Sequence, residues 1–330
     1  MTNRLTSFTR RAAVVVSLGA LALAAQGALA QAWPAKTIRI VVGFAAGGPT
    51  DVVARAFAEH ASRALGQPVI VENKPGANTV LAAEVVASSA PDGYTLLLGA
   101  TNHTMIPALY SARVKFDAVR SFTPVCTLAE SPTVLVVGPA MKVTNLAGFV
   151  QAVQAAPGKR TFGSPGPGSS GHFAGERFAR LTRTSMNHIP YKGAAPAVTD
   201  LLGGQLDSSF ATLGSVLTHV QSGKLTALAV ASAQRSPLLP SVPTFEEAGV
   251  KGFRDDAWYG LLAPAGTPPG VLEALEKAAR GFTQSPATVE KLGGLGLNAQ
   301  NVCAAAFSNQ LQREVQANSQ LAKELNLKLD

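Results

Sequence analysis

Hydrophobic positions fall in short apolar runs, which are separated by longer segments with helical spacing. The runs at 38–42, 69–71 and 94–98 are rich in aliphatic residues and are bounded by Gly, Pro or Asn, as is typical of strands. Residues 52–65 and 78–88 between them have helical spacing. This alternation predicts βαβ units, and therefore a parallel sheet covered by helices on both faces.

The alternation breaks over residues 121–140, where two strand-like runs, 122–128 and 133–137, have little helix between them. Further strands are expected near 161, near 189, at 206–210 and at 225–231. Further helices are expected from 146, and at 172–181, 195–202, 271–282, 287–292 and 304–325. We therefore expect two α/β lobes with extended crossings near 130 and 230. Lobe 1 would comprise 31–130 and 230–330, and lobe 2 would comprise 131–229.

Residues 1–30 follow a different pattern. Three arginines in an acid-free start precede the apolar run 12–25, which is shorter than the ~20 residues that a membrane-spanning helix needs. Small residues follow, with cleavage patterns that end at Ala30 and Ala32. The pattern predicts a secretory signal peptide, cleaved after Ala30 or Ala32. An uncleaved membrane anchor is the alternative.

Composition and charge exclude several classes of protein. The chain has 330 residues, of which 47% are hydrophobic, so it is not a disordered protein. Its net charge of +8 falls to +5 without the arginines of residues 1–30, and no basic stripe interleaved with aromatic residues supports nucleic-acid binding. Cys126 and Cys303 could form a disulfide or remain two buried thiols, because their spacing alone does not decide.

The glycine-rich turn at 43–51 joins the first strand to the first helix. It is excluded as a nucleotide-hydrolysing P-loop because Pro49 stands where that motif requires lysine. A loop without bulky side chains before a helix start still suits an anion. Asp51 either supports the helix start and pairs with Arg55, or anchors a ligand.

A second glycine-rich turn at 163–172 matches G-x-G-x-x-G through Gly166, Gly168 and Gly171. Residues 183–199 contain no Asp or Glu for a ribose, which argues against dinucleotide binding. The turn is interpreted as an anion cradle to which Ser164 and Ser169 add hydroxyl groups. An ordinary glycine-rich helix start is the alternative.

Other chemistry-bearing residues are few. Lys192, before a third helix start, could contact a carboxylate or be a solvated surface lysine. Asp207 could orient a ligand or simply finish a turn. The chain has no G-x-S-x-G elbow and no H-x-x-x-H or C-x-x-C pair, so we expect no catalysis, no metal and no cofactor.

Taken together, these segments resemble the Bug-type (TctC-like) substrate-binding proteins of tripartite tricarboxylate transporters. The resemblance rests on WPAKTIRIVVGFAAGGPTDVVAR, PVIVENKPGA, APDGYTLLLGA, FGSPGPGSSGHFAGERF, HIPYKGAAPAVTDLLGGQLD, SGKLTALAVAS, SVPTFEEAG and WYGLLAPAGTP. It covers essentially the whole chain after residue 30. One departure follows Lys74-Pro75-Gly76-Ala77, where the family often continues with glycines and this chain has Asn78 and Thr79.

The resemblance implies a periplasmic solute-binding protein of the type II periplasmic-binding-protein fold, with two α/β lobes, a hinge and a ligand cleft. It implies capture of a small organic carboxylate by lobe closure and delivery to integral-membrane permease subunits, by a monomer. A ligand sensor without a transporter, acting on a sensor protein, and a secreted α/β enzyme are the alternatives. The ligand-binding residues that it implies are Phe44, Ala46, Gly47, Gly48, Asp51, Thr101, Asn102, Ser164, Gly166, Gly168, Ser169, His172, Tyr191, Lys192 and Asp207.

Overall fold

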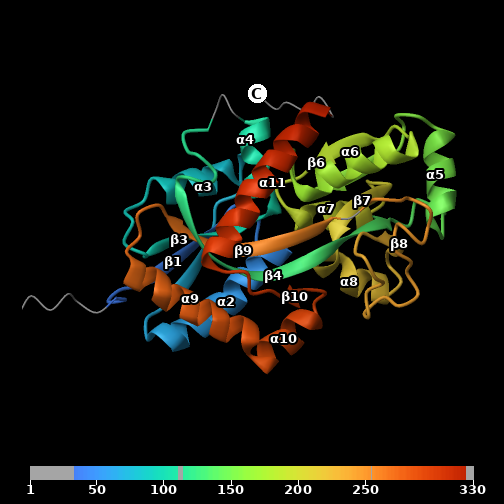
Figure 1. Ribbon diagram of the computed structural model, residues 1–330. Helices are drawn as coiled ribbons and strands as arrows, with labels where there is room; N and C mark the ends of the chain where they lie inside the picture. Colours follow the sequence, from blue (N-terminus) through green and yellow to red (C-terminus); the bar gives the residue numbers. More distant parts are fainter. Residues whose placement is uncertain (1–32, 111–113, 254, 325–330) are drawn as a thin grey trace, which may run out of the picture. The chain divides into compact units, whose positions relative to one another are not determined.

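The computed structural model describes residues 33–110, 114–253 and 255–324 (Figure 1). The expected signal peptide and its cleavage positions lie outside these residues. Residues 33–36 lie outside the compact unit that begins at Thr37, and the fold described below is that of this unit. No helix in the described part of the chain is long and apolar enough to cross a membrane.

The first lobe begins with the expected parallel strands. β1 (Ile38–Val42) lies between β2 (Val69–Asn73) and β3 (Thr95–Ala100), and both neighbours run parallel to it. The connecting helices are α2 (Pro49–Leu65) and α3 (Val80–Ala87). α3 follows the short 3-10 helix η1 (Ala77–Thr79), and a second 3-10 helix, η2 (Thr101–Thr104), follows β3.

The centre of the sheet differs from the expectation. The two runs after residue 121 form one strand, β4 (Phe122–Val137), and β9 (Asp256–Pro264), which was not predicted, lies between β3 and β4. β9 is antiparallel to both neighbours, and β7 is antiparallel to β4, so the parallel pairing predicted from the βαβ units is confirmed for β1, β2 and β3 but does not extend across the centre of the sheet. The reason is that the chain passes between the lobes twice. β4 runs from the first lobe toward the second, and β9 runs back in the opposite direction beside it.

The second lobe is built on the other half of β4. Its strands are β5 (Thr161–Ser164), β6 (Asn187–Pro190), β7 (Ser208–Thr212) and β8 (Thr226–Val230). β5 pairs in parallel with β6 and β7, whereas β7 and β8 pair antiparallel with β4. Its helices are α5 (Leu146–Gln154), α6 (Ser170–Thr182), α7 (Ala194–Leu202) and α8 (Leu213–Gln221), of which α8 was not predicted.

The remaining elements cover the first lobe. They are α4 (Ile106–Leu109), α9 (Pro269–Gln284), α10 (Pro286–Gly293), β10 (Asn298–Ala299) and α11 (Ala304–Glu324). α9 packs against α2, and α11 lies against β4 and α4 (Figure 1). Cys126 of β4 and Cys303, just before α11, form a disulfide, which settles a pairing that the spacing left open.

Extended segments connect the lobes, so the fold has two α/β lobes, a hinge and a cleft. β4 continues from one lobe into the other, where Thr133 N–H donates to Asp255 O (2.9 Å) and Ala231 N–H donates to Thr133 O (2.7 Å). A buried apolar cluster also joins the lobes, because it includes both Phe173 of α6 and Leu109 of α4. Displacing the lobes about these extended residues would leave the strands within each lobe paired, but it would separate this cluster.

Candidate functional site

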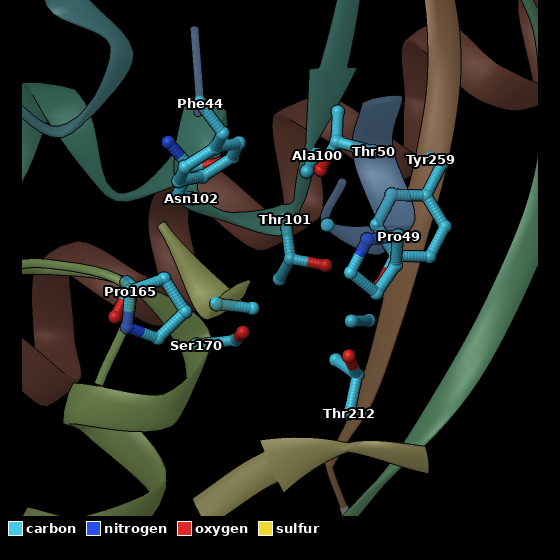
Figure 2. A pocket seen from close by; sticks show the side chains of 14 residues that line it. Phe44, Pro49, Thr50, Ala100, Thr101, Asn102, Pro165, Ser170, Thr212 and Tyr259 are labelled. Atoms are coloured by element: carbon cyan, nitrogen blue, oxygen red, sulfur yellow. The ribbon is translucent and has the colours of Figure 1, made fainter. Parts of the chain in front are cut away.

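Two neighbouring pockets lie between the lobes, and we call them the inner and the outer pocket. The inner pocket is lined by Phe44, Gly48, Pro49, Thr50, Ala100, Thr101, Asn102, Pro165, Ser169, Ser170, Ala194, Thr212, Ala257 and Tyr259 (Figure 2). The outer pocket is lined by Gly43, Phe44, Gly76, Ala77, Asn78, Thr79, Tyr110, Pro165, Gly166, Pro167, Pro190, Tyr191 and Lys192. Phe44 and Pro165 belong to both linings.

Four α-helices of the described chain begin at the inner pocket. Gly48 is the residue before α2, Ser169 precedes α6 and Thr212 precedes α8, while Ala194 is the first residue of α7. The first turn of a helix has N–H groups without intrahelical partners, and it carries the positive end of the helix dipole. The inner pocket therefore gathers backbone donors from both lobes around one small volume, an arrangement that suits an anion.

The inner pocket holds no charged side chain. None of the described residues that line it is Lys, Arg, His, Asp or Glu. Thr101 supplies a hydroxyl that is directed into the pocket in Figure 2, and its Oγ1 accepts a hydrogen bond from the Trp258 N–H (2.9 Å), which leaves the O–H free to donate. Burial raises the pKa of Tyr259, so its phenol also remains protonated and able to donate.

Asn102 connects the inner pocket to the outer one. Its amide Nδ2 donates to Asn78 O (3.0 Å) and to Thr79 Oγ1 (2.7 Å), and lies 3.5 Å from Asn78 Oδ1. Within the described chain, Asn102 Oδ1 and Asn78 Nδ2 are buried and have no hydrogen-bond partner. Residues 77–79 all have positive φ, a conformation that costs a non-glycine residue about 1–3 kcal/mol.

Asp51 lies behind the inner pocket and does not line it. Its carboxylate accepts hydrogen bonds from Gly47 N–H (3.0 Å), Arg55 Nε (2.9 Å) and Asn73 Nδ2 (2.9 Å). Burial raises the pKa of Asp51, but the hydrogen bonds from Arg55, Gly47 and Asn73 outweigh it, and the net pKa is lowered. The expected pairing with Arg55 is present, and the carboxylate holds the 43–51 turn in place.

The second glycine-rich turn rests on two stacked histidines. Gly168 N–H donates to His172 Nδ1 (2.9 Å), and Ser164 Oγ lies 2.7 Å from His188 Nε2. Burial lowers the pKa of His172 to about 4, and burial together with the neighbouring His172 lowers the pKa of His188 to about 3. The neutral rings support the turn from beneath, and Ser164 is fully buried, so this Ser–His pair is not exposed to a substrate.

Two other predicted residues have partners of their own. Asp207 pairs with Arg160 (3.0 Å) and accepts a hydrogen bond from Thr161 N–H (2.9 Å). The Tyr191 hydroxyl donates to Asp200 Oδ2 (2.6 Å), and Tyr191 lines the outer pocket.

The predicted ligand-binding residues thus fall into three groups. Those that line the inner pocket are Phe44, Gly48, Thr101, Asn102 and Ser169. Those that line the outer pocket are Phe44, Gly166, Tyr191 and Lys192. Those that line neither pocket are Ala46, Gly47, Asp51, Ser164, Gly168, His172 and Asp207.

Several lining residues were missed from the sequence. Ser170 and Ala194 stand at helix starts beside predicted turns, so the turns themselves pointed toward them. Thr212 and Tyr259 could not be found in this way, because α8 and β9 were not predicted. The aromatic–apolar run that begins at Trp258 was the available signal for β9.

The lobes touch beside the pockets. Ala45 N–H of the first lobe donates to Lys192 O of the second (3.2 Å). A Cβ built on Gly168 would lie 2.1 Å from Leu109 Cδ1 and 2.9 Å from Asn78 Nδ2, so this glycine allows the close approach. The cavity volume is about 40 Å³ for the inner pocket and about 310 Å³ for the outer pocket. The two lobes are therefore in contact across the cleft in this structure.

Comparison with known proteins agrees with this geometry. Residues 53–327 match the family described as the tripartite tricarboxylate transporter family receptor, TctC. The chain is 37% identical over 291 residues to protein BugT of Bordetella pertussis, a match that covers 88% of this chain and 89% of BugT.

Two solved structures with bound ligands have the same fold. Rpa4515 of R. palustris with adipate has a TM-score of 0.87 and 30% identity, covering 90% of this chain and 100% of its own. MatC of Rhodopseudomonas palustris with bound malate has a TM-score of 0.83 and 31% identity, covering 88% of this chain and 99% of its own. The chain therefore belongs to the TctC family of tripartite tricarboxylate transporter receptors, which are two-lobed solute-binding proteins of the type II periplasmic-binding-protein fold.

Proposed function

We propose that the protein binds a small organic carboxylate in the inner pocket by closure of its two lobes and passes it to a tripartite tricarboxylate-type membrane permease. The observation that carries this proposal is the convergence of four helix N-termini on a pocket without charged side chains. Adipate and malate, bound by the two structural relatives, are both dicarboxylates.

Backbone donors are sufficient for such a site. Hydrogen bonds to a charged group contribute roughly 1.5–3 kcal/mol each. Four to six of them, after the cost of ordering the ligand and the lobes, support a dissociation constant near 1 μM, or about −8 kcal/mol. A carboxylate enters this site without the desolvation of a buried arginine.

The proposed biological setting follows from the family and from the first residues of the sequence. The signal peptide would be removed after Ala30 or Ala32, and the mature protein would act in the periplasm as a monomer. Its lobes would comprise 31–130 with 230–330, and 131–229. We propose a binding protein rather than an enzyme, and in support Ser164, which contacts His188, is buried and offers no accessible nucleophile.

The test is a thermal-shift screen of the mature protein against mono-, di- and tricarboxylates, with neutral sugars and amides as comparison. A ligand at 100 times its dissociation constant stabilises the folded state by about 2.7 kcal/mol. Stabilisation by organic acids is expected. Stabilisation by neutral compounds alone would contradict the proposal.

Ser170→Asp gives a sharper test. Ser170 is the first residue of α6, where the dipole stabilises a carboxylate, so the variant should fold normally. Its charge would repel a bound carboxylate by several kcal/mol at about 4 Å, and affinity should fall at least about 100-fold. Ala147→Asp, in the exposed first turn of α5, is the matched control and should bind like the wild type. Unchanged affinity in Ser170→Asp would show that the carboxylate does not bind in the inner pocket.

A further inference from the structure

We infer that Glu314 of α11 is a positioning residue for the inner pocket, because it contacts the two elements, β9 and η2, that together fix Thr101. The inference rests on the proposed function, in which the Thr101 hydroxyl is one of the donors to the bound carboxylate. It extends the binding machinery to a helix whose residues line neither pocket.

Glu314 holds the side chain of Trp258 on β9. The indole Nε1 of Trp258 donates to Glu314 Oε2 (2.7 Å), and Trp258 is only 4% exposed. A buried indole N–H needs an acceptor, and a carboxylate is a strong one. The backbone N–H of the same Trp258 donates to Thr101 Oγ1 (2.9 Å). Fixing the indole therefore also limits the movement of the N–H group that orients the Thr101 hydroxyl.

Glu314 also contacts η2, through Thr104. The buried Thr104 hydroxyl lies 2.8 Å from Thr101 O and 3.2 Å from Glu314 Oε2, and its oxygen accepts a hydrogen bond from Asn318 Nδ2 (2.9 Å). Because a hydroxyl has one proton, Thr104 donates either to the nearer Thr101 O or to Glu314. The carbonyl and the hydroxyl of Thr101 are thus each held by a residue that Glu314 contacts.

These contacts come from one face of α11. Gln310, Glu314 and Asn318 follow each other at four-residue spacing, which places them on one side of the helix, and Gln310 Nε2 donates to Glu314 Oε1 (2.8 Å). Phe307 and Leu311 of α11 belong to a buried apolar cluster of the first lobe, which fixes this part of the helix. The carboxylate is therefore a fixed anchor for β9 and η2.

Three substitutions separate positioning from a role in stability alone. Glu314→Gln keeps a side-chain oxygen that can accept the indole N–H of Trp258, whereas Glu314→Ala removes it. Leu275→Ala, on α9, is the control for stability. Leu275 is 1% exposed and lines neither pocket, so its truncation should destabilise the first lobe without changing the site.

The first measurement needs no ligand. Trp33 and Trp258 are the two tryptophans of the sequence, so in a Trp33→Phe background the fluorescence reports Trp258 alone. Glu314→Ala should shift the emission maximum of Trp258, because the indole loses its acceptor, whereas Glu314→Gln and Leu275→Ala should keep it. An unchanged emission maximum in Glu314→Ala would show that Glu314 does not hold Trp258, and the inference would be wrong.

The second measurement is a double-mutant cycle on affinity by titration calorimetry. The probe is adipate or, if the wild type does not bind adipate, the acid that stabilises it most in the thermal-shift screen. Glu314→Ala should reduce affinity at least about fivefold when Thr101 is present, but less than about twofold in Thr101→Val, because its effect passes through that hydroxyl. Glu314→Gln and Leu275→Ala should bind within about twofold of the wild type.

The outcomes of the cycle distinguish the inference from the proposed function. Unchanged affinity in Glu314→Ala, or an equal loss with and without the Thr101 hydroxyl, would overturn the inference while the proposed function stands. A loss of affinity in Leu275→Ala as large as in Glu314→Ala would also overturn it, since the effect would then follow stability. If no organic acid binds the wild type, the proposed function fails and the inference falls with it.

Discussion

The imidazole rings of His172 and His188 stack face to face, with centroids 3.9 Å apart and planes 11° apart. His172 Nδ1 accepts the Gly168 N–H, and His188 Nε2 bonds to Ser164, so the pair supports the second glycine-rich turn at its start and at its middle. Glu176 faces His172 at 3.8 Å, and Phe162 stacks on His188. The turn therefore depends on two neutral rings.

Acid should weaken both the fold and ligand binding. The unfolded chain would protonate these histidines near pH 6.5, whereas their pKa values in the folded state are about 4 and about 3. The unfolded state thus binds more protons below pH 6.5, and the free energy of unfolding falls as the pH drops from about 6.5 toward 4. Denaturant unfolding and calorimetric titration at several pH values measure the two effects.

The variant His172→Asn distinguishes protonation of the stacked histidines from the effect of acid on the other titratable groups. The Asn oxygen can replace Nδ1 as the acceptor for Gly168 N–H and does not titrate, so the variant should show a flatter pH profile. His219→Asn, at the C-terminal end of α8, should keep the profile of the wild type. A profile that is equally steep in His172→Asn would show that the stack is not responsible.

Gly168→Ala should hold the lobes apart. The new methyl group would meet Leu109 Cδ1 at 2.1 Å across the cleft, at a residue whose φ is +73°. We expect affinity to fall at least about tenfold, because the ligand must also provide the energy to close a strained cleft. Gly223→Ala has a similar φ of +70° and no neighbour within 4 Å, so it isolates the effect of backbone strain. Equal affinities for the two variants would contradict the prediction that the new methyl group holds the lobes apart.

Thr101→Val should reduce both stability and affinity. The buried N–H of Trp258 would lose its acceptor, at a cost of about 1–3 kcal/mol in the free energy of unfolding, and the ligand would lose a donor. Thr101→Ser keeps the hydroxyl and should recover most of both quantities. If Thr101→Val unfolds at a lower denaturant concentration but binds the ligand with normal affinity in calorimetry, the hydroxyl stabilises the fold and does not contact the ligand.

The double variant Cys126→Ser/Cys303→Ser should be less stable but should bind normally. The bridge joins positions 177 residues apart, and loss of a native disulfide typically costs about 2–5 kcal/mol. Neither cysteine lines the pockets, so ligand affinity should change less than about twofold. Denaturant titrations of both proteins, with and without reductant, test this. An identical unfolding midpoint would mean that the bridge does not stabilise the fold.

Local sequence signals determined much of the first lobe and the turns around the cleft. The runs at 38–42 and 69–71 became β1 and most of β2, because aliphatic runs next to Gly or Pro fit a buried parallel sheet. The turn before α2 and the turn before α6 supply residues of the inner pocket, since glycines at a helix start leave backbone N–H groups accessible.

Only the tertiary structure decided which turns meet and what lies between them. β9 carries Tyr259 into the inner pocket by pairing with β3 and β4, which are distant in the sequence, and no local pattern specifies that pairing. From the sequence, Asp51 and Asp207 could each contact a ligand or support the local structure, and in the structure their carboxylates pair with Arg55 and Arg160. The sequence determined where backbone donors could be exposed. The packing of the two lobes determined that these donors, rather than charged side chains, line the inner pocket, because a helix presents its free N–H groups only where its first turn faces a cavity.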